Sequence, residues 1–378
     1  MKKIQMVDLK GQYKQIKERV DTSIAEVMES TAFINGPEVH TFQKELEEYL
    51  GVKHVIPCAN GTDALQIAMM GLGLKPGDEV ITADFTFAAT VEVIALLGLT
   101  PVLVDVNPHS FNIDLEAVKK AITPKTKAIV PVHLFGQVAE MQELMRIAKE
   151  NKLYVIEDNA QAIGADYTQQ DGSKIKAGTI GHVGSTSFFP SKNLGCYGDG
   201  GAIFTNDDEL AHTLRGIVNH GMYERYHHDV VGVNSRLDSI QAAVLRAKLP
   251  HLDTYNSERR EAARKYTKAL AGNEKIITPL ICDICDCHVF HQYTLRLKDI
   301  DRDALVKYLN SKDIPCGVYY PIPLHKQKAY ADERYNERDF TVTNQLVQEV
   351  ISLPMHTELD DEQIDFITKT VLEFLDGI

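Results

Sequence analysis

Short hydrophobic runs alternate with amphipathic segments between about residues 52 and 205. Each run is rich in β-branched residues and has the length of one buried strand. Segments with apolar residues at helical spacing separate several of the runs, as in TDALQIAMMGL (62–72) and MQELMRIAKEN (141–151). Successive strands run in the same direction only if helices cross between them, so the pattern predicts an α/β fold with a mostly parallel, doubly covered sheet. The predicted strands are HVIPC (54–58), DEVITA (78–83), PVLVDV (101–106), KAIVPV (127–132), LYVIED (153–158), STSFF (185–189) and GAIFT (201–205).

After about residue 235 the pattern predicts longer helices and then a second unit. SRLDSIQAAVLRAKL (235–249) and NSERREAARKYTKALAG (256–272) indicate a helical connection that kinks at Pro250. We therefore predict a large domain with an N-terminal arm, residues 1–255, and a small C-terminal α+β domain, residues 256–378. The predicted elements of the small domain are a strand at 288–297, a helix at 301–313, a strand at 316–320 and helices around 347–356 and 361–375.

The composition is that of a globular protein with more acidic than basic residues. Of 378 residues, 44% are hydrophobic and 25% are charged, and 40 Lys and Arg against 53 Asp and Glu give a formal net charge of -13. This balance excludes a broad basic surface, so we expect neither nucleic acid nor a membrane as a partner. An anionic ligand has to be held by local groups.

The sequence lacks the features of an exported or membrane-spanning protein. The two Lys near its start are not followed by an apolar run, and no later stretch is apolar for the length of a membrane span. The six Cys are unevenly spaced, unlike a disulfide framework. We expect a cytoplasmic protein.

A first candidate site is the turn in CANGTDALQI (58–67). A strand ends at Asn60 and Gly61 and a helix begins at Thr62, which points free backbone N–H groups and a hydroxyl at an anion. An ordinary capped helix explains the same residues. The familiar phosphate motifs are missing, because the chain has no GxxxxGK[ST] and GLGLKPG (71–77) lacks the GxGxxG spacing.

A second candidate site is VIEDNAQAIG (155–164). A predicted strand ends there with Glu157 and Asp158, and Gln161 follows three residues after Asp158. A carboxylate at the mouth of a parallel sheet is costly to desolvate without a partner, although a helix cap is a competing explanation. The spacing lets the side chains of Asp158 and Gln161 face one small ring.

A third candidate is Lys192 in SFFPSKNLGCYGDGG (187–201). Phe188, Phe189 and Pro190 flank it, so we expect partial desolvation, which lowers the pKa of the amine and frees its neutral form to attack a carbonyl. Taken alone, Lys192 is better explained as an ordinary surface residue. A phosphate-ready helix start, a strand-end Asp and a shielded Lys are together the three anchors that pyridoxal 5'-phosphate requires: the Asp keeps the pyridine nitrogen protonated and the Lys carries the aldehyde.

Several of these stretches resemble one known family. CANGTDALQI, SFFPSKNLGCYGDGGAIFTNDDELA (187–211), GVNSRLD (232–238) and YYPIPLHKQ (319–327) are similar to the DegT/DnrJ/EryC1/StrS family of nucleotide-sugar aminotransferases, and the similarity covers nearly the whole chain. Within the family the chain most resembles the enzymes that aminate carbon 3 of UDP-2-acetamido-2-deoxy-3-oxoglucuronate in bacterial O-antigen synthesis. The resemblance implies a fold-type I pyridoxal-phosphate transferase and a homodimer with shared active sites.

The resemblance also implies roles for individual residues. Lys192 would be the catalytic residue, which binds the cofactor aldehyde covalently and moves protons between cofactor and substrate. Asp158 would pair with the pyridine nitrogen, Gln161 would meet the ring hydroxyl and Phe87 would stack on the ring. The groups implied to hold the phosphate are Gly61, Thr62, Ser187 and, from a neighbouring subunit, Asn234.

A nucleotide sugar is the substrate that the resemblance implies. Arg236 would offer it a positive charge across the subunit interface, and Tyr320 would contact the sugar, with aromatic core packing as the competing explanation. Uronate-using relatives carry His where this chain has Tyr319. The further residues predicted to bind substrate are Tyr319 and His325 near the sugar, and Arg225, His227 and His228 near the diphosphate.

A zinc site was considered at CDICDCHVFH (282–291), which gathers three Cys and two His. Zinc sites usually join two separated pairs of ligands, whereas these residues are packed into one run that enters a strand. We therefore predict no metal.

The sequence as a whole predicts an enzyme that moves an amino group from glutamate to carbon 3 of a nucleotide-linked keto sugar in lipopolysaccharide biosynthesis. Amination at carbon 4 stays open. A sugar dehydratase on the same scaffold is disfavoured, because those relatives carry His in place of Lys192. A binding or regulatory protein without activity is disfavoured by the intact set of Asp158, Gln161 and Lys192.

Overall fold

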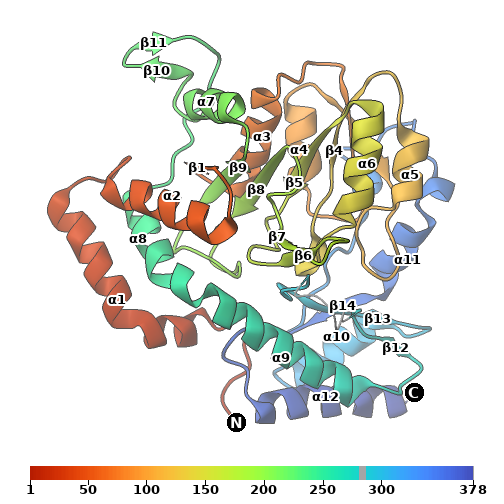
Figure 1. The fold of residues 1–378 in the computed structure, drawn as a ribbon. Helices are drawn as coiled ribbons and strands as arrows, with labels where there is room; N and C mark the ends of the chain where they lie inside the picture. Colours follow the sequence, from red (N-terminus) through yellow and green to blue (C-terminus); the bar gives the residue numbers. More distant parts are fainter. Residues whose placement is uncertain (281–286, 378) are drawn as a thin grey trace.

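The computed structural model describes residues 1–280 and 287–377. At its centre lies a seven-stranded sheet with the strand order β1-β9-β8-β5-β4-β2-β3 (Figure 1). The strands are β1 (His54–Cys58), β2 (Glu79–Ala83), β3 (Thr100–Val104), β4 (Thr126–Val130), β5 (Tyr154–Asp158), β8 (Val183–Ser187) and β9 (Gly201–Thr205). β9 runs antiparallel to β1 and β8, and the other neighbouring strands are parallel. The predicted α/β fold with a mostly parallel sheet is confirmed.

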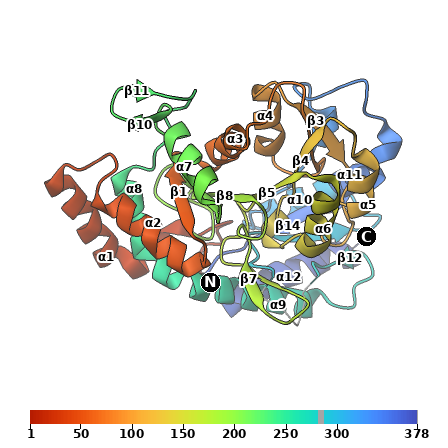
Figure 2. The same ribbon diagram turned by 45° about the horizontal axis from the view of Figure 1, so that its top comes forward.

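The strands read as continuous apolar runs because both faces of the sheet are covered. Consecutive residues of β5 illustrate this arrangement, since Val155 belongs to one hydrophobic core and Ile156 to the opposite one. α3 (Gly61–Gly71), α4 (Ala89–Leu96) and α7 (Asp208–Ile217) cover the Ile156 side. α5 (Leu115–Ala121) and α6 (Met141–Asn151) cover the other side (Figure 2).

Three helices flank the β1 end of the sheet: α1 (Leu9–Ser30), α2 (Pro37–Leu50) and α8 (Ser239–Lys248) (Figure 1). Phe42 and Leu46 of α2 pack with Leu245 of α8 in a separate core. A short 3-10 turn at Leu249–His251 contains Pro250 and leads into α9 (Leu252–Leu270). The kinked helical connection predicted at Pro250 is confirmed.

A second, smaller sheet with the order β12-β13-β14 lies below the main one (Figure 1). Its strands, β12 (Ile276–Ile277), β13 (Tyr293–Leu297) and β14 (Val350–Leu353), are antiparallel. α9 and α12 (Asp361–Asp376) pack with this sheet in its own core, together with α10 (Arg302–Ser311). Ile4 joins that core, and α9 crosses the predicted boundary at 255/256, which stays a prediction.

Two predictions for this unit were wrong. A helix was expected around 347–356, but α11 (Thr341–Glu349) ends within that segment, and Val350–Leu353 forms β14, whose four residues are buried and pair with β13. β-branched residues suit such a buried strand. The segment 316–320 was expected to be a strand, but it contributes a single bridge from Gly317 to Ser352.

Two hairpins extend from the main body. β6 (Asp166–Thr168) pairs with β7 (Lys174–Lys176), and β10 (Met222–Glu224) pairs with β11 (His227–His228). The second hairpin projects beyond α7 (Figures 1 and 2). Tyr226, at its turn, is 76% exposed and Val231, just after it, is 84% exposed.

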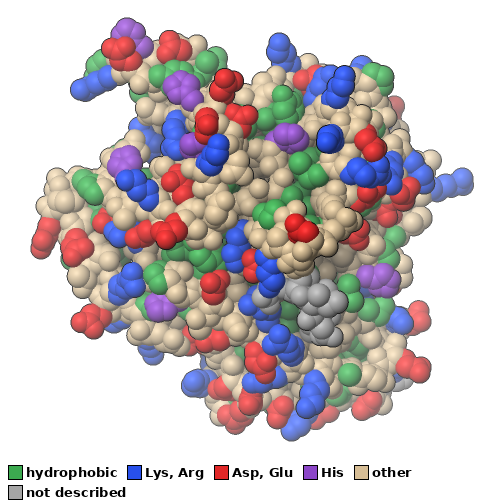
Figure 3. All heavy atoms as spheres, viewed as in Figure 1, with side chains coloured by type: hydrophobic (Ala, Val, Ile, Leu, Met, Phe, Trp, Pro, Cys, Tyr) green, Lys and Arg blue, Asp and Glu red, His purple; other side chains and the backbone are tan. Residues whose placement is uncertain are grey.

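Charges of both signs are interspersed over the face seen in Figure 3, as the composition led us to expect. None of the helices in residues 1–280 and 287–377 combines the length and the apolar character needed to cross a membrane.

Candidate active site

A cavity of about 500 Å³ opens at the carboxyl edge of the main sheet. Its lining comes from residues at or just after the ends of β1, β2, β4, β5 and β8, the edge at which open α/β sheets bind ligands. A segment before β13 and the loop at 319–320 complete it. The cavity brings together nine of the predicted site residues: Gly61, Thr62, Phe87, Asp158, Gln161, Ser187, Lys192, Tyr319 and Tyr320.

The turn from β1 into α3 forms one end of the cavity. Asn60 caps the helix, because its Oδ1 accepts a hydrogen bond of 2.8 Å from the backbone N–H of Asp63. A Cβ at Gly61 would lie 2.7 Å from Cβ of Ser187, so only glycine lets this turn approach the end of β8. The helix N-terminus and the hydroxyls of Thr62 and Ser187 therefore lie at one end of the cavity, an arrangement that suits an anion.

Asp158 ends β5 in the middle of the cavity and is only 5% exposed. Its Oδ2 accepts a hydrogen bond of 2.8 Å from Oγ1 of Thr90 on α4, and its Oδ1 accepts one of 3.2 Å from the backbone N–H of Ala160. These two bonds satisfy one lone pair on each oxygen and fix the plane of the carboxylate. The fixed carboxylate lines the cavity, where it can pair with a positively charged atom of a ligand.

Gln161 links the main sheet to the loop of the second unit. Its Oε1 accepts a hydrogen bond of 2.6 Å from the backbone N–H of Phe135, which leaves the amide group to point the other way. Nε2 donates to the hydroxyl of Tyr320 at 3.2 Å. The ring of Tyr320 packs against Phe85 and Phe87, with ring centroids 6.1 and 6.2 Å apart.

Lys192 lies half-buried in the cavity, in a loop whose backbone is fixed on both sides. Its own N–H donates to the carbonyl of Phe189 at 2.8 Å. The next side chain, Asn193, donates to Oδ1 of Asn256 at 2.7 Å and to the carbonyl of Val289 at 3.0 Å. Desolvation lowers the pKa of the Lys192 amine to about 8, although the charge of Asp158 acts in the opposite direction.

Phe87 lies at the mouth of the cavity, where its side chain is 57% exposed. An exposed aromatic ring at a cavity mouth is available to stack on a flat ligand. Its place beside Tyr320 gives the cavity an aromatic wall.

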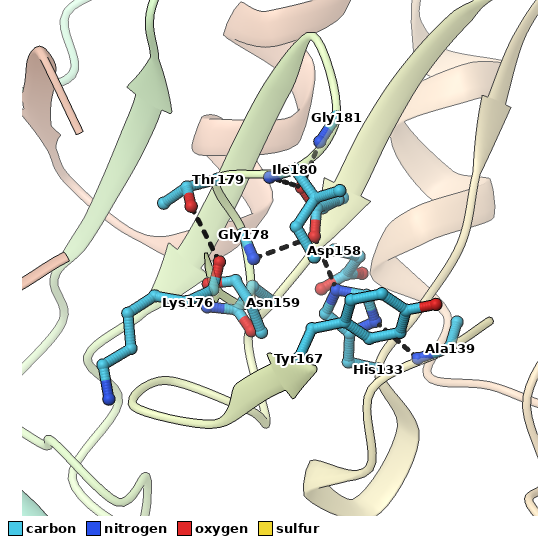
Figure 4. A network of polar contacts seen from close by, with 12 residues as sticks. His133, Ala139, Asp158, Asn159, Tyr167, Lys176, Gly178, Thr179, Ile180 and Gly181 are labelled. Atoms are coloured by element: carbon cyan, nitrogen blue, oxygen red, sulfur yellow. Dashed lines mark hydrogen bonds and ion pairs between the residues drawn. The ribbon is translucent and has the colours of Figure 1, made fainter. Parts of the chain in front are cut away.

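Beneath the cavity, Glu157 and His133 form a fully buried network, most of which Figure 4 shows. Oε2 of Glu157 lies 2.9 Å from Nε2 of His133, and Nδ1 of His133 accepts a hydrogen bond of 3.2 Å from the backbone N–H of Ala139. Nε2 of His133 therefore carries the hydrogen and donates to Glu157. The Glu157 carboxylate also accepts hydrogen bonds from the backbone N–H groups of Gly178, Ile180 and Gly181. The network holds the 178–181 turn next to the strand end that carries Asp158.

The structure places six predicted site residues outside this cavity. Asn234 is exposed and Arg236 half-buried, in a segment next to Ser235, whose Oγ accepts a hydrogen bond from the backbone N–H of Ala59 at 3.0 Å. His325 lies in the short helix Leu324–Lys326, bonded to Asp84 and stacked on Phe340. Of the residues predicted near the diphosphate, Arg225, His227 and His228 belong to the projecting β10–β11 hairpin.

Sequence reasoning missed several polar residues of the cavity, among them Thr86, His291 and Gln292. Thr86 directly precedes Phe87, and His291 belongs to the run that was considered as a zinc site. Residues 282–286 of that run lie outside the described residues. Among the residues that the structure describes, no group of three or more His, Cys, Asp or Glu is placed to hold a metal.

Comparison with known proteins assigns the chain to a family. It matches the model of the DegT/DnrJ/EryC1/StrS aminotransferase family over residues 14–372. The chain belongs to this family. Its fold is that of the solved aminotransferase structures in the family.

Three curated members of the DegT/DnrJ/EryC1/StrS family are similar along their whole length. The chain is 46% identical to the "Pleiotropic regulatory protein" of Geobacillus stearothermophilus, covering 98% of each chain. It is 46% identical to the UDP-2-acetamido-2-deoxy-3-oxo-D-glucuronate aminotransferase of Pseudomonas aeruginosa, covering 96% of this chain and 98% of that one. It is 43% identical to the UDP-N-acetyl-3-dehydro-alpha-D-glucosamine 3-aminotransferase of Acidithiobacillus ferrooxidans, covering 99% and 98%.

Solved structures share the fold of this family member. DesV of S. venezuelae, in complex with a ketimine intermediate, has a TM-score of 0.93 with 39% identity, and the match covers 99% of each chain. NtdA of Bacillus subtilis, with the cofactor PMP bound, has a TM-score of 0.88 with 32% identity, covering 96% of this chain and 82% of that one.

Proposed function

We propose that this sugar aminotransferase moves an amino group from glutamate to carbon 3 of a UDP-linked keto sugar. The observation that carries the proposal is the amine of Lys192 in one cavity with the carboxylate of Asp158 and an anion-ready helix start. Support for the sugar comes from the two relatives named for UDP-linked 3-keto substrates. Surface polysaccharide synthesis in the cytoplasm is the proposed setting.

Aminotransferases of this family depend on pyridoxal phosphate, and the cavity residues fit that group. The α3 N-terminus with Gly61, Thr62 and Ser187 would hold the phosphate. Asp158 would meet the pyridine nitrogen, Gln161 the ring hydroxyl, and Phe87 the ring face. The cofactor, once bound, supplies an electron sink for the carbon next to the transferred nitrogen.

Each of the main residues performs a step that its surroundings favour. Asp158, whose oxygens are fixed by Thr90 and Ala160, holds a proton on the pyridine nitrogen. Lys192 would bind the cofactor aldehyde when no substrate is present, because its lowered pKa of about 8 leaves far more of the amine uncharged near neutral pH than in an ordinary lysine. Once a substrate amine has replaced it, the Nζ of Lys192 would carry the proton from the donor carbon to the cofactor carbon, and in the second half-reaction from the cofactor carbon to the sugar carbon.

A homodimer completes the proposed site. Asn234 and Arg236 lie outside the cavity of their own chain, which leaves them available to a neighbouring one, and the β10–β11 hairpin projects from the body. In the dimer, Asn234 of the neighbouring chain would reach the phosphate and Arg236 the nucleotide sugar. Arg225, His227 and His228 would lie near the diphosphate.

Two alternatives define the test. Tyr319, where uronate-using relatives carry His, leaves a neutral sugar as a competing substrate. Amination at carbon 4 also stays open. The relative from Geobacillus stearothermophilus is named as a regulatory protein, so a non-enzymatic role is the second alternative. Lys192 disfavours a dehydratase, whose members carry His at that position.

Two experiments test the proposal. Glutamate added to the purified protein with bound cofactor should bleach the visible absorbance band. If no amino donor bleaches the band, the protein is not a transaminase. A panel of UDP- and dTDP-linked 3-keto and 4-keto sugars, with products identified by mass and proton coupling, then fixes the substrate. Reaction with the 4-keto compounds alone would reject amination at carbon 3.

A further inference from the structure

Three side chains of the cavity end in buried polar atoms without a partner. Oγ1 of Thr86, Nδ1 of His291 and Oε1 of Gln292 are shielded from solvent and make no hydrogen bond to the residues that the structure describes. Thr86 is 3% exposed and His291 is 9% exposed. Buried polar groups without a partner are rare in proteins and costly to keep. Three of them around one cavity indicate a ligand that supplies the missing partners.

The proposed cofactor contacts do not use these atoms. Its phosphate, pyridine nitrogen, ring hydroxyl, ring face and aldehyde are assigned to the α3 N-terminus, Asp158, Gln161, Phe87 and Lys192. The three unpartnered groups therefore remain for the substrates. His291 lies near the reacting amine, because the positive charge of Lys192 helps to lower the pKa of this imidazole, after the larger effect of its burial.

The three groups share one chemical property, which is that they are uncharged. The hydroxyl of Thr86 and the neutral imidazole of His291 can each donate a hydrogen bond without carrying a charge, and the amide of Gln292 accepts through Oε1 and donates through Nε2. Among the described residues that line the cavity, Lys192 is the one Lys or Arg, and the acids are Asp158 and Asp199. An acidic substrate therefore finds neutral donors near the reacting centre in place of an arginine.

Neutral donors suit an enzyme that handles two unlike substrates at one position. The amino donor carries an α-carboxylate on its reacting carbon, whereas the keto sugar carries hydroxyl or acetamido groups on the neighbouring carbons. An arginine would bind the carboxylate well, but would be left as an unpaired charge beside the sugar. A neutral group can donate a hydrogen bond to either kind of oxygen at little cost.

We propose that Thr86, His291 and Gln292 form a neutral subsite, which binds the α-carboxylate of the amino donor in one half-reaction and the polar groups beside the keto carbon in the other. The inference rests on the proposed aminotransferase function. It names these three side chains as substrate-binding residues of both half-reactions.

Three variants test the neutral subsite, each in the protein with bound cofactor. T86V and H291F remove hydrogen bonding while keeping shape, and Q292E adds a negative charge. The bleaching rate is measured against glutamate concentration, and the reverse half-reaction against the amino-sugar product. Binding is measured separately with 2-methylglutamate, which has no α-hydrogen to lose, from the shift of the absorbance band. T86V and H291F should each raise the concentration needed for half-saturation about tenfold, both for glutamate and for the amino sugar.

The charge variant separates the neutral subsite from a general loss of structure. Q292E should weaken glutamate binding at least about tenfold more than amino-sugar binding, because only glutamate carries a carboxylate there. H291N, which keeps one N–H donor, should recover part of the binding that H291F loses. T168V is the matched control, since Oγ1 of Thr168 is also buried without a partner but lies on β6 outside the cavity. It should leave half-saturation unchanged.

Thermal stability provides a second readout. T86V removes a hydroxyl without a protein partner, so the melting temperature of the ligand-free protein should stay the same or rise. A lower melting temperature with unchanged binding would assign Thr86 a structural role and overturn the inference. Unchanged half-saturation in T86V and H291F, with normal bleaching of the unmodified protein, would overturn the neutral subsite alone. Failure of the unmodified protein to bleach would overturn the proposed function together with it.

Discussion

His325 and Asp84 are joined by two hydrogen bonds that fasten the loop of the second unit to the end of β2. The backbone N–H and Nδ1 of His325 donate to the two carboxylate oxygens of Asp84, at 2.7 and 2.6 Å. The next N–H, that of Leu324, donates to the carbonyl of Asp84 at 3.2 Å. The same loop carries Tyr320 into the cavity, so the pair acts as a positioning clamp rather than as a wall of the cavity.

Substituting His325 distinguishes the clamp from direct sugar binding. Asn keeps a donor near the position of Nδ1, whereas Leu has none, so we expect H325L to raise KM for the nucleotide sugar about tenfold and H325N to raise it far less. The KM for the nucleotide sugar is measured in each variant by steady-state kinetics, with the nucleotide sugar varied at a fixed concentration of glutamate. Equal losses in the two variants would favour direct contact of the imidazole with the sugar.

The reactivity of Lys192 should depend on pH through its lowered pKa. The neutral amine is the nucleophile, and its pKa of about 8 means that half of it is neutral near pH 8 and that the neutral fraction levels off about one pH unit higher. The rate at which cofactor-free protein takes up pyridoxal phosphate should follow this curve in stopped-flow absorbance. A rate that keeps rising to pH 10 would show an ordinary, unshifted lysine.

Asp158 should influence that curve from across the cavity. Its negative charge raises the pKa of Lys192 against the effect of desolvation, so D158N should move the midpoint of the uptake curve to lower pH. Turnover should fall on the order of 100-fold, because an amide cannot hold the proton on the pyridine nitrogen. An unchanged midpoint would mean that the two groups do not interact.

The Glu157–His133 network should stabilise the floor of the site. In E157Q the new amide group has no lone pair for the backbone N–H groups of the 178–181 turn, and it opposes the hydrogen on Nε2 of His133. The free energy of unfolding should fall by about 3 kcal/mol in urea denaturation. Glu150, exposed on α6 and paired with Arg146, is the matched control, and E150Q should change stability by less than about 1 kcal/mol.

The main sheet could be predicted because its strands are buried on both faces. Runs such as HVIPC and GAIFT coincide with β1 and β9, and polar residues at their ends predicted the cavity edge. The run VISLPM (350–355) was misread as helical because it is nearly continuous in apolar residues, and such a run does not separate a buried strand from a helix. Pairing with β13, a long-range contact, decided the outcome.

Site residues could be predicted from the sequence where the residue type and its neighbours indicate a chemical role. They could not be predicted where the only sign is a buried polar atom without a hydrogen-bond partner. Lys192 and Asp158 stand at strand ends with neighbours that mark them. Thr86 and His291 differ from core residues only in a missing hydrogen bond, which depends on the surrounding fold. His325 appeared in a sugar-binding motif, but its partner Asp84 is 241 positions away along the chain.

Borohydride reduction tests the central claim most directly, that Lys192 binds pyridoxal phosphate covalently. The reduced protein is digested with trypsin and the fragments are weighed. The phosphopyridoxyl group should appear on the fragment of residues 177–215, which stays uncut at Lys192 because the modified side chain is no longer a cleavage site, and the K192A variant should carry no label. Label on any other lysine, or an equal amount of label in K192A, would contradict the account.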